Sequence, residues 1–261
     1  MIHCDYSLLI CAAISVVAIL LIGISKAGFG GAAGILTTPL LSLIFPAKFV
    51  IGFMLPLMIL ADGFTIYHHR WHWDWKNLRQ LIPGTLLGIG FGWLFIGSVS
   101  DVGLKRAIGF IVIVFVAFQF IRSRIFAESI NFHPRWWHGA LAGAAAGFVS
   151  TVAHSAGVII ALYLLPQKLD KRVYVSTMVL YFAGLNLTKL IPYFQLHLIT
   201  AETVKLSLFY IPFIPLGTFI GAWMNRKLSQ QAFITLIYIF VVLTALKLVA
   251  GSNLFPFLIG R

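Results

Sequence analysis

Long apolar stretches recur along the whole chain, separated by short segments that contain glycine, proline or charged residues. Ten apolar elements can be recognised; they cover residues 8–25, 30–45, 48–67, 78–98, 103–122, 137–151, 155–165, 171–190, 203–223 and 231–250. A helix needs about 20 mainly apolar residues to cross a bilayer. The pattern therefore predicts an all-α polytopic membrane protein with no separate soluble domain.

Composition strengthens this interpretation. Of the 261 residues, 60% are hydrophobic and only 10% are charged, which is more apolar surface than a soluble core of this length can bury. We expect the chain to be surrounded by membrane lipid. The first apolar stretch lacks a basic segment before it and a small-residue cleavage site, so we expect a retained span and not a signal peptide.

Two pairs of elements are separated by small residues without the charged loop that usually marks an exit into water. The first break lies near "GISKAGFGGAAGILTTP" (23–39) and the second near "GFVSTVAHSAG" (147–157). Because glycine and small polar residues interrupt helices, each pair is predicted to be a broken helix near the midplane, and whether it crosses fully or turns back is left open.

The two halves of the chain resemble each other. "AGILTTPLLSLIFPAK" (33–48) aligns with "AGVIIALYLLPQKLDK" (156–171) at an offset of 123 residues, and "GTLLG" (84–88) has an echo in "GTFIG" (217–221). Five elements repeated twice is the economical interpretation, with repeats at residues 1–125 and 126–261. An odd number of net crossings in each half makes the repeats inverted, as in many secondary transporters.

The formal charge of +12 is spread over short loops and does not form one basic face, so no nucleic-acid partner is expected. Apart from Lys26 and Lys247, which fall in or beside apolar elements, the loops on one side carry eleven Lys and Arg and those on the other side six. The positive-inside rule then places both termini outside the cytoplasm. We expect the plasma (inner) membrane of a bacterium.

The first break contains candidates for an anion site. A helix that begins after a break presents free backbone N–H groups and the positive end of its dipole, and glycine lets a ligand come close. Lys26 would add a full charge beside Gly28, Gly30 and Gly31, and Thr37 and Thr38 follow about two turns later as hydroxyl donors. The alternative is that the glycines only allow close helix packing.

The second break offers side-chain donors at matching positions. His154 aligns with Gly31, and Ser150 and Ser155 flank it. Further polar contacts come from Asn186 and Lys189 in "LNLTKLIPYF", although Lys189 has the alternative of extending outward to the interface. A structural, hydrogen-bonded histidine is the competing interpretation of His154.

Asp62 in "LPLMILADGFTIY" is the one acidic residue well inside a predicted span. A carboxyl group shielded from water can take up and release a proton near neutral pH, which makes Asp62 the candidate for proton coupling. An internal salt bridge, or a position near the cytoplasmic interface, is the alternative.

No metal site or cofactor is predicted. The histidines of "YHHRWHWDWKNLR" (67–79) lack suitably spaced cysteine or acidic partners, and their mixture with tryptophan is typical of a membrane-interface belt. Cys4 and Cys11 show no CxxC or zinc-type spacing, so neither a disulfide nor a metal site is assigned.

These motifs together resemble the sulfite exporter TauE/SafE-like transporter family. The resemblance rests on "SKAGFGGAAGILTTPLL", on "LPLMILADGFTIYHHRWHWDWKNLRQLIPGTLLGIGFGW", and on "AHSAGVIIALYLL" with "NLTKLIPYF", and it covers nearly the whole chain. It implies transport of sulfite, thiosulfate, sulfoacetate or another organosulfonate. The second half departs from a glycine-rich pattern at His154 and Ser155.

The expected function is secondary transport of such an anion by alternating access, with proton coupling as a hypothesis. The chain has no ATP-binding motif of the G-x-x-x-x-G-K-[ST] type. An intramembrane lipid enzyme is a weaker alternative because Asp62 has no second intramembrane carboxylate. An anion channel would use the same residues, and assembly into a homo-oligomer is left open.

Overall fold

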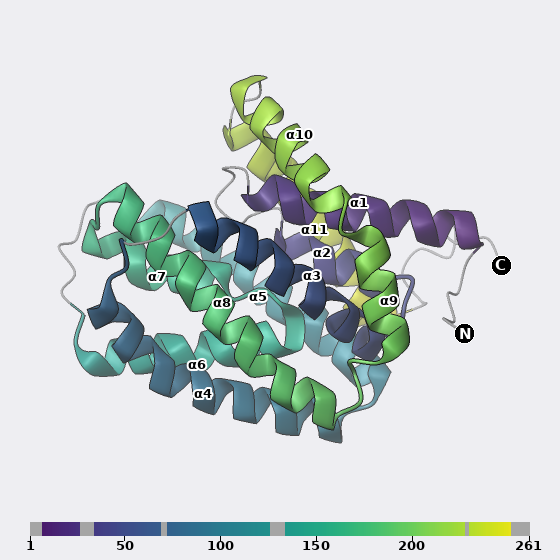
Figure 1. The fold of residues 1–261 in the computed structure, drawn as a ribbon, viewed down its shortest axis with the longest axis horizontal. Helices are drawn as coiled ribbons and strands as arrows, with labels where there is room; N and C mark the ends of the chain where they lie inside the picture. Colours follow the sequence, from purple (N-terminus) through teal and green to yellow (C-terminus); the bar gives the residue numbers. More distant parts are fainter. Residues whose placement is uncertain (1–6, 27–33, 69–71, 126–133, 228–229, 252–261) are drawn as a thin grey trace. The chain divides into compact units, whose positions relative to one another are not determined.

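The computed structural model of the protein describes residues 7–26, 34–68, 72–125, 134–227 and 230–251. Every regular element in these ranges is helical, which confirms the all-α prediction (Figure 1). The elements are α1 (Leu8–Lys26), α2 (Gly34–Ser42), α3 (Ala47–His68), α4 (Trp75–Ser98), α5 (Asp101–Ile125), α6 (Trp136–Ala153), α7 (Gly157–Leu164), the 3₁₀ turn η1 (Leu165–Gln167), α8 (Lys171–Gln195), α9 (Ala201–Tyr210), α10 (Phe213–Lys227) and α11 (Gln230–Ala250).

Four of these helices, α1, α3, α4 and α8, are long and apolar enough to cross a membrane, and α9 and α10 meet the same test as a broken pair. Large apolar side chains such as Phe91, Phe110 and Phe219 are exposed on the helix surfaces, 64–72% of each being accessible. Such exposure would be costly in water, whereas it suits a lipid surface. The prediction of apolar membrane-spanning helices is thereby confirmed.

The predicted element at 203–223 was wrong as a single helix, because the structure divides it into α9 and α10. Pro212 explains the division: it has no N–H to donate, and its ring clashes with the preceding turn. The expectation that no disulfide forms was also wrong, since Cys11 is disulfide-bonded. Spacing alone carries little information about whether Cys11 forms such a bond.

The second predicted break is confirmed. Helix α6 ends at Ala153 and α7 begins at Gly157, with His154 in the left-handed conformation (φ 51°) as the C-cap of α6. At the first break α1 ends at Lys26 and α2 begins at Gly34, and the residues between them lie outside the described ranges. The short lengths of α2 and α7, nine and eight residues, leave neither able to cross a bilayer alone.

Contacts divide the chain into two compact units. Unit 1 is drawn from residues 1–50, 99–121 and 209–261, and unit 2 from residues 51–98 and 122–208. Each unit therefore combines elements from both halves of the sequence. The predicted boundary near residue 125 concerns the sequence repeat and not this contact division, so it stays a prediction.

Both units contain helix pairs that pack through glycine. In unit 2, α4 and α6 run side by side, with Gly84 and Gly88 against the backbone of α6 and Gly143 and Gly147 against that of α4 (Figure 1). In unit 1, α1 packs on α10 through Gly23 and Gly217. Small residues let membrane helices approach closely, and dispersion and backbone contacts then hold them together.

We expect Gly84→Ala to destabilise unit 2. A methyl group at this position would clash with the Ala140 carbonyl and the Ala144 backbone nitrogen. These are backbone atoms of α6, which cannot shift without moving the helix. Overpacking of this kind costs about 1–3 kcal/mol. Gly90→Ala on the same helix is the matched control because its methyl group would enter open space. Thermal unfolding of the purified variants measures the effect, and equal melting temperatures would refute the close α4–α6 contact.

Candidate functional site

Unit 2 buries a group of polar side chains, from three helices, inside otherwise apolar surroundings. Asp62 comes from α3, Ser150 and His154 come from the end of α6, and Asn186 and Lys189 come from α8. Below, these five residues are called the Lys189 cluster. All five were predicted from the sequence as site residues, and the structure brings them together.

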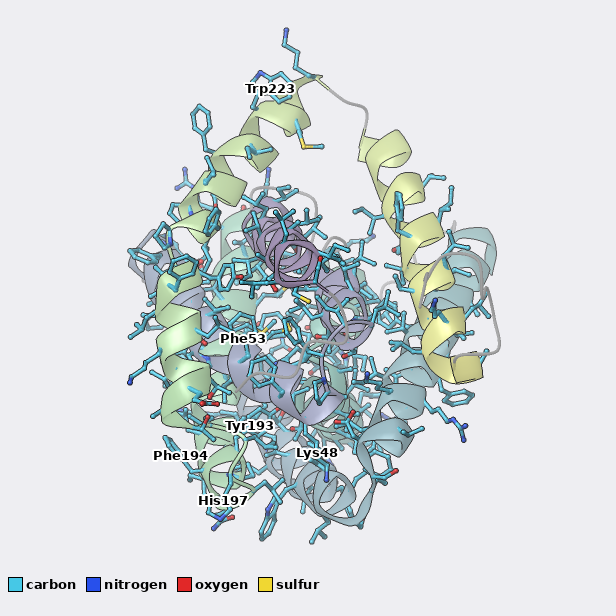
Figure 2. All side chains as sticks on the ribbon, turned by 90° about the vertical axis from the view of Figure 1, so that its right-hand side faces the viewer. Lys48, Phe53, Tyr193, Phe194, His197 and Trp223 are labelled. Carbon is cyan, nitrogen blue, oxygen red and sulfur yellow. The ribbon has the colours of Figure 1, made fainter. Side chains whose placement is uncertain are left out.

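The spacing of residues along α8 explains how this helix contributes to the cluster. Asn186, Lys189 and Tyr193 follow each other at intervals of three and four, which places them on one face of a helix. All three are buried, with Lys189 and Tyr193 at 0% exposure. Tyr193 lies in the interior, whereas its neighbour Phe194 lies at the surface (Figure 2).

The Lys189 ammonium contacts the last turn of α6. Its Nζ lies 2.9 Å from Ser150 Oγ, 3.3 Å from the Ser150 carbonyl oxygen and 3.0 Å from His154 Nδ1. An ammonium group has three donors, so these three acceptors use all of them. The position is electrostatically favourable because the C-terminal end of a helix attracts a cation. Lys189 therefore points into the bundle and does not extend outward to the interface.

His154 links the ammonium to α3. Its Nε2 lies 3.0 Å from the carbonyl oxygen of Ile51, and a carbonyl can only accept a hydrogen bond. Nε2 must then carry the proton, which leaves Nδ1 as the acceptor for Lys189. This assignment makes His154 neutral, and it follows from the two partners and not from an observed hydrogen.

Asp62 and Asn186 form a buried pair. The Asn186 amide donates to Asp62 Oδ2 over 2.6 Å, and the exposed fractions are 3% for Asp62 and 5% for Asn186. Asp62 also interacts electrostatically with Lys189. The cluster thus contains a carboxyl group and an amino group that interact electrostatically, and ionisable groups inside a membrane are a mark of functional sites.

Sequence reasoning missed Tyr193. Its hydroxyl donates to the Thr151 carbonyl over 2.6 Å, and its ring centroid lies 6.0 Å from Lys189 Nζ and 6.1 Å from the His154 ring. The sequence did contain a clue, since Tyr193 follows Lys189 by four residues and so lies on the same face of a helix. It was hidden by an aromatic-rich sequence in which most tyrosines and phenylalanines serve packing.

The other predicted site residues are placed differently. The Ser155 hydroxyl donates to the nearby Ala153 carbonyl over 2.9 Å, so it caps its own turn. Lys26 is the last residue of α1, and its side chain is not described. Gly28, Gly30 and Gly31 lie outside the described residues.

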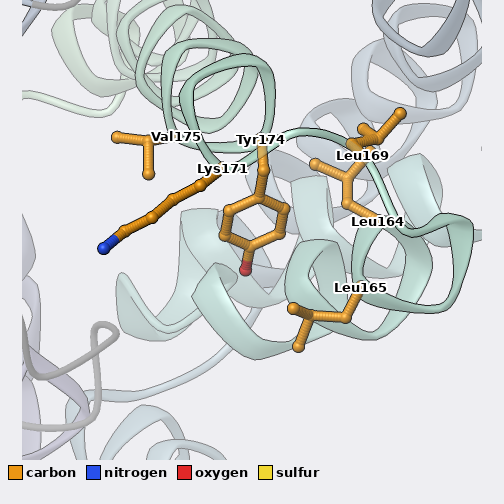
Figure 3. A pocket seen from close by; sticks show the side chains of 6 residues that line it. All are labelled: Leu164, Leu165, Leu169, Lys171, Tyr174 and Val175. Carbon is orange, nitrogen blue, oxygen red and sulfur yellow. The ribbon is translucent and has the colours of Figure 1, made fainter.

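A pocket elsewhere in unit 2 shares no residue with the cluster. It is lined by Leu164, Leu165, Leu169, Lys171, Tyr174 and Val175, around the turn that joins α7 to α8 (Figure 3). Figure 3 shows the Lys171 ammonium directed away from the three leucines. The mainly apolar lining is poorly suited to an inorganic anion.

Comparison with known proteins adds one finding to this geometry. The model of the sulfite exporter TauE/SafE family matches residues 15–248, which is most of the chain and includes every member of the Lys189 cluster. No curated protein and no solved structure matches the chain. With apolar spanning helices, a broken helix and a buried charged cluster already described, the match to the family model leads to one conclusion: the chain is an integral membrane protein that belongs to the sulfite exporter TauE/SafE family of transporters.

Proposed function

We propose that the protein is a secondary transporter of a small sulfur-containing anion, namely sulfite, thiosulfate or an organosulfonate, and that the Lys189 cluster binds it. The observation that carries the proposal is a fully buried ammonium at the end of a broken helix. A lysine near the bilayer centre costs about 2.5–3.5 kcal/mol on insertion scales. A lysine with this cost is expected in a membrane protein mainly where its charge serves binding or conduction.

An incoming anion has a clear place in the cluster. Lys189 is held by the Ser150 oxygens and the His154 imidazole, all of which are neutral acceptors. Hydrogen bonds to charged acceptors are roughly twice as strong as those to neutral ones. An oxyanion that displaces His154 therefore gains a stronger bond, and the released Nδ1 can turn to accept a proton or a water molecule.

Asp62 provides a reason for proton coupling. While Asp62 is ionised, its charge offsets that of Lys189 and opposes the entry of an anion. When Asp62 takes up a proton, the cluster becomes net positive and attracts the anion. By linkage, proton binding and anion binding then strengthen each other by the same factor, which is the requirement for moving both in one direction.

Alternating access between two inverted halves is part of the proposal. It is supported by α2 and α7, which begin at Gly34 and Gly157, the two glycines that the offset of 123 aligns. It is also supported by the glycine contacts, since the first helix of each half packs on the fourth element of the other: α1 on α10, and α6 on α4. When two repeats are related by a two-fold axis, a contact from the first repeat to the second is matched by the equivalent contact from the second to the first.

We further propose a bacterial inner-membrane location with both termini outside the cytoplasm. The loop charges support this orientation. Assembly into a homo-oligomer remains open to test by the mass of the purified protein in detergent.

Flux into proteoliposomes tests the function. We expect sulfite, thiosulfate or a sulfonate to enter with saturable kinetics and to accumulate when the outside is made acidic. Failure of all three anion classes to move would refute the proposal. Flux that neither saturates nor responds to the pH gradient would refute the carrier mechanism in favour of a channel.

A further inference from the structure

In unit 1, the short helix α2 contains a buried hydroxyl group that the fold does not use. Thr37 has 0% exposure, and its Oγ1 has no hydrogen-bond partner among the described residues. Other buried threonines bond to the carbonyl four residues earlier, as Thr85 does to Leu81 and Thr244 does to Phe240. A buried hydroxyl without a partner is unfavourable, so its presence needs an explanation.

The position of Thr37 suggests one. It follows Gly34, the first residue of α2, by three residues and thus lies on the same face, and helical side chains tilt toward the N-terminus. From this tilt we expect the Thr37 side chain to lie over the first turn of α2, where backbone N–H groups lack helical partners. The second such hydroxyl, on Ser42, belongs to the opposite end of α2.

A third group converges on the same helix end. Ser25, in the last turn of α1, is 9% exposed, and its Oγ lies 3.2 Å from the point that a Cβ on Gly34 would occupy. The absence of a side chain on Gly34 thus leaves the Ser25 hydroxyl next to the start of α2. Two hydroxyl donors and a helix N-terminus form a set that favours negative charge.

Packing does not require this polarity. The offset of the repeat aligns Thr37 with Ile160 of α7, which is also 0% exposed. An apolar β-branched side chain therefore satisfies the equivalent position. Compared with an apolar side chain, the unpaired hydroxyl of Thr37 lowers the stability of the folded protein. Residues at binding sites commonly lower stability in this way.

We propose that Ser25, the N-terminus of α2 and Thr37 form an oxyanion-binding site in unit 1, separate from the Lys189 cluster. This inference rests on the proposed function, since it takes the transported anion to be the ligand. The hydroxyl and N–H groups donate to the oxygens of a small sulfur oxyanion. They supply no negative charge, which excludes a bare cation as the preferred ligand.

Thr37→Val tests the site because valine keeps the shape of threonine and removes the hydroxyl. Binding of sodium thiosulfate to the purified full-length protein is measured by calorimetry. We expect about a 10- to 100-fold loss of affinity, as for one hydrogen bond to a charged ligand. The melting temperature without thiosulfate should stay equal or rise, because an unpaired buried hydroxyl is removed. Thr244→Val, which removes a hydroxyl bonded to its own helix, is the matched control and should bind normally.

The outcomes separate this inference from the proposed function. If the parent binds thiosulfate and Thr37→Val binds it equally well, the unit 1 site is refuted while the function stands. If the parent binds none of thiosulfate, sulfite and an organosulfonate, the proposed function itself fails. A Thr37→Val protein that melts several degrees below the parent would show that the hydroxyl has a structural partner, and this result would also overturn the site.

Discussion

Replacement of Lys189 with methionine is expected to abolish anion transport. Methionine matches the unbranched length of lysine but offers no charge and no donor to Ser150 or His154. Loss of one partner from a buried, charged hydrogen-bond set costs about 2–5 kcal/mol of binding free energy, which is on the order of 30-fold or more in affinity. The measurement is thiosulfate uptake into proteoliposomes, together with calorimetric binding.

Two further variants keep this prediction decisive. Lys205→Met, on the exposed face of α9, removes a lysine of the same half and should leave transport unchanged. Lys189→Met also leaves the buried Asp62 without its cationic neighbour, which threatens the fold. The double variant Lys189→Met with Asp62→Asn removes both charges and should recover stability without recovering transport. Transport by the folded double variant would contradict the role of Lys189.

Asp62→Asn is expected to separate binding from coupling. Asparagine resembles the protonated carboxyl group in shape and charge, so position 62 can no longer take up or release a proton. We expect the variant still to bind thiosulfate. Accumulation driven by a pH gradient should be lost.

The matched control is Asp170→Asn. Asp170 is the N-cap of α8, where its side chain accepts from the Arg172 N–H, and asparagine serves equally well at that position. Gradient-driven uptake should therefore survive. If Asp62→Asn still accumulated thiosulfate against a gradient, another group would have to carry the proton.

Much of the fold was accessible from the sequence because lipid removes most alternatives. A backbone in hydrocarbon must satisfy its own hydrogen bonds, so apolar stretches become helices and interruptions become breaks. The break at His154 was predicted because small polar residues replace a charged loop there. The interruption at Pro212 was missed because the flanking stretch is uniformly apolar and hydropathy does not register a missing N–H donor.

The site was predictable in its members but not in its contacts. Lys189, His154 and Asp62 stood out because polar groups are rare inside spans, and rarity can be read from sequence alone. The sequence did not show that Lys189 turns inward to Ser150 or that Tyr193 lies beside it. Both contacts depend on how α6 and α8 pack in three dimensions. Similarly, Thr37 could be noted as a donor, but its lack of a partner is a property of the folded chain.

The central claim is that the buried ammonium of Lys189 binds the transported anion, and selenite gives the most direct test of it. Selenite has the shape and charge of sulfite, and selenium can be located by its anomalous scattering in crystals of the full-length protein. A selenium peak with oxygens within hydrogen-bond distance of Lys189 Nζ, absent in the Lys189→Met variant, is the predicted result. Bound selenite with no peak within reach of Lys189 would contradict the account.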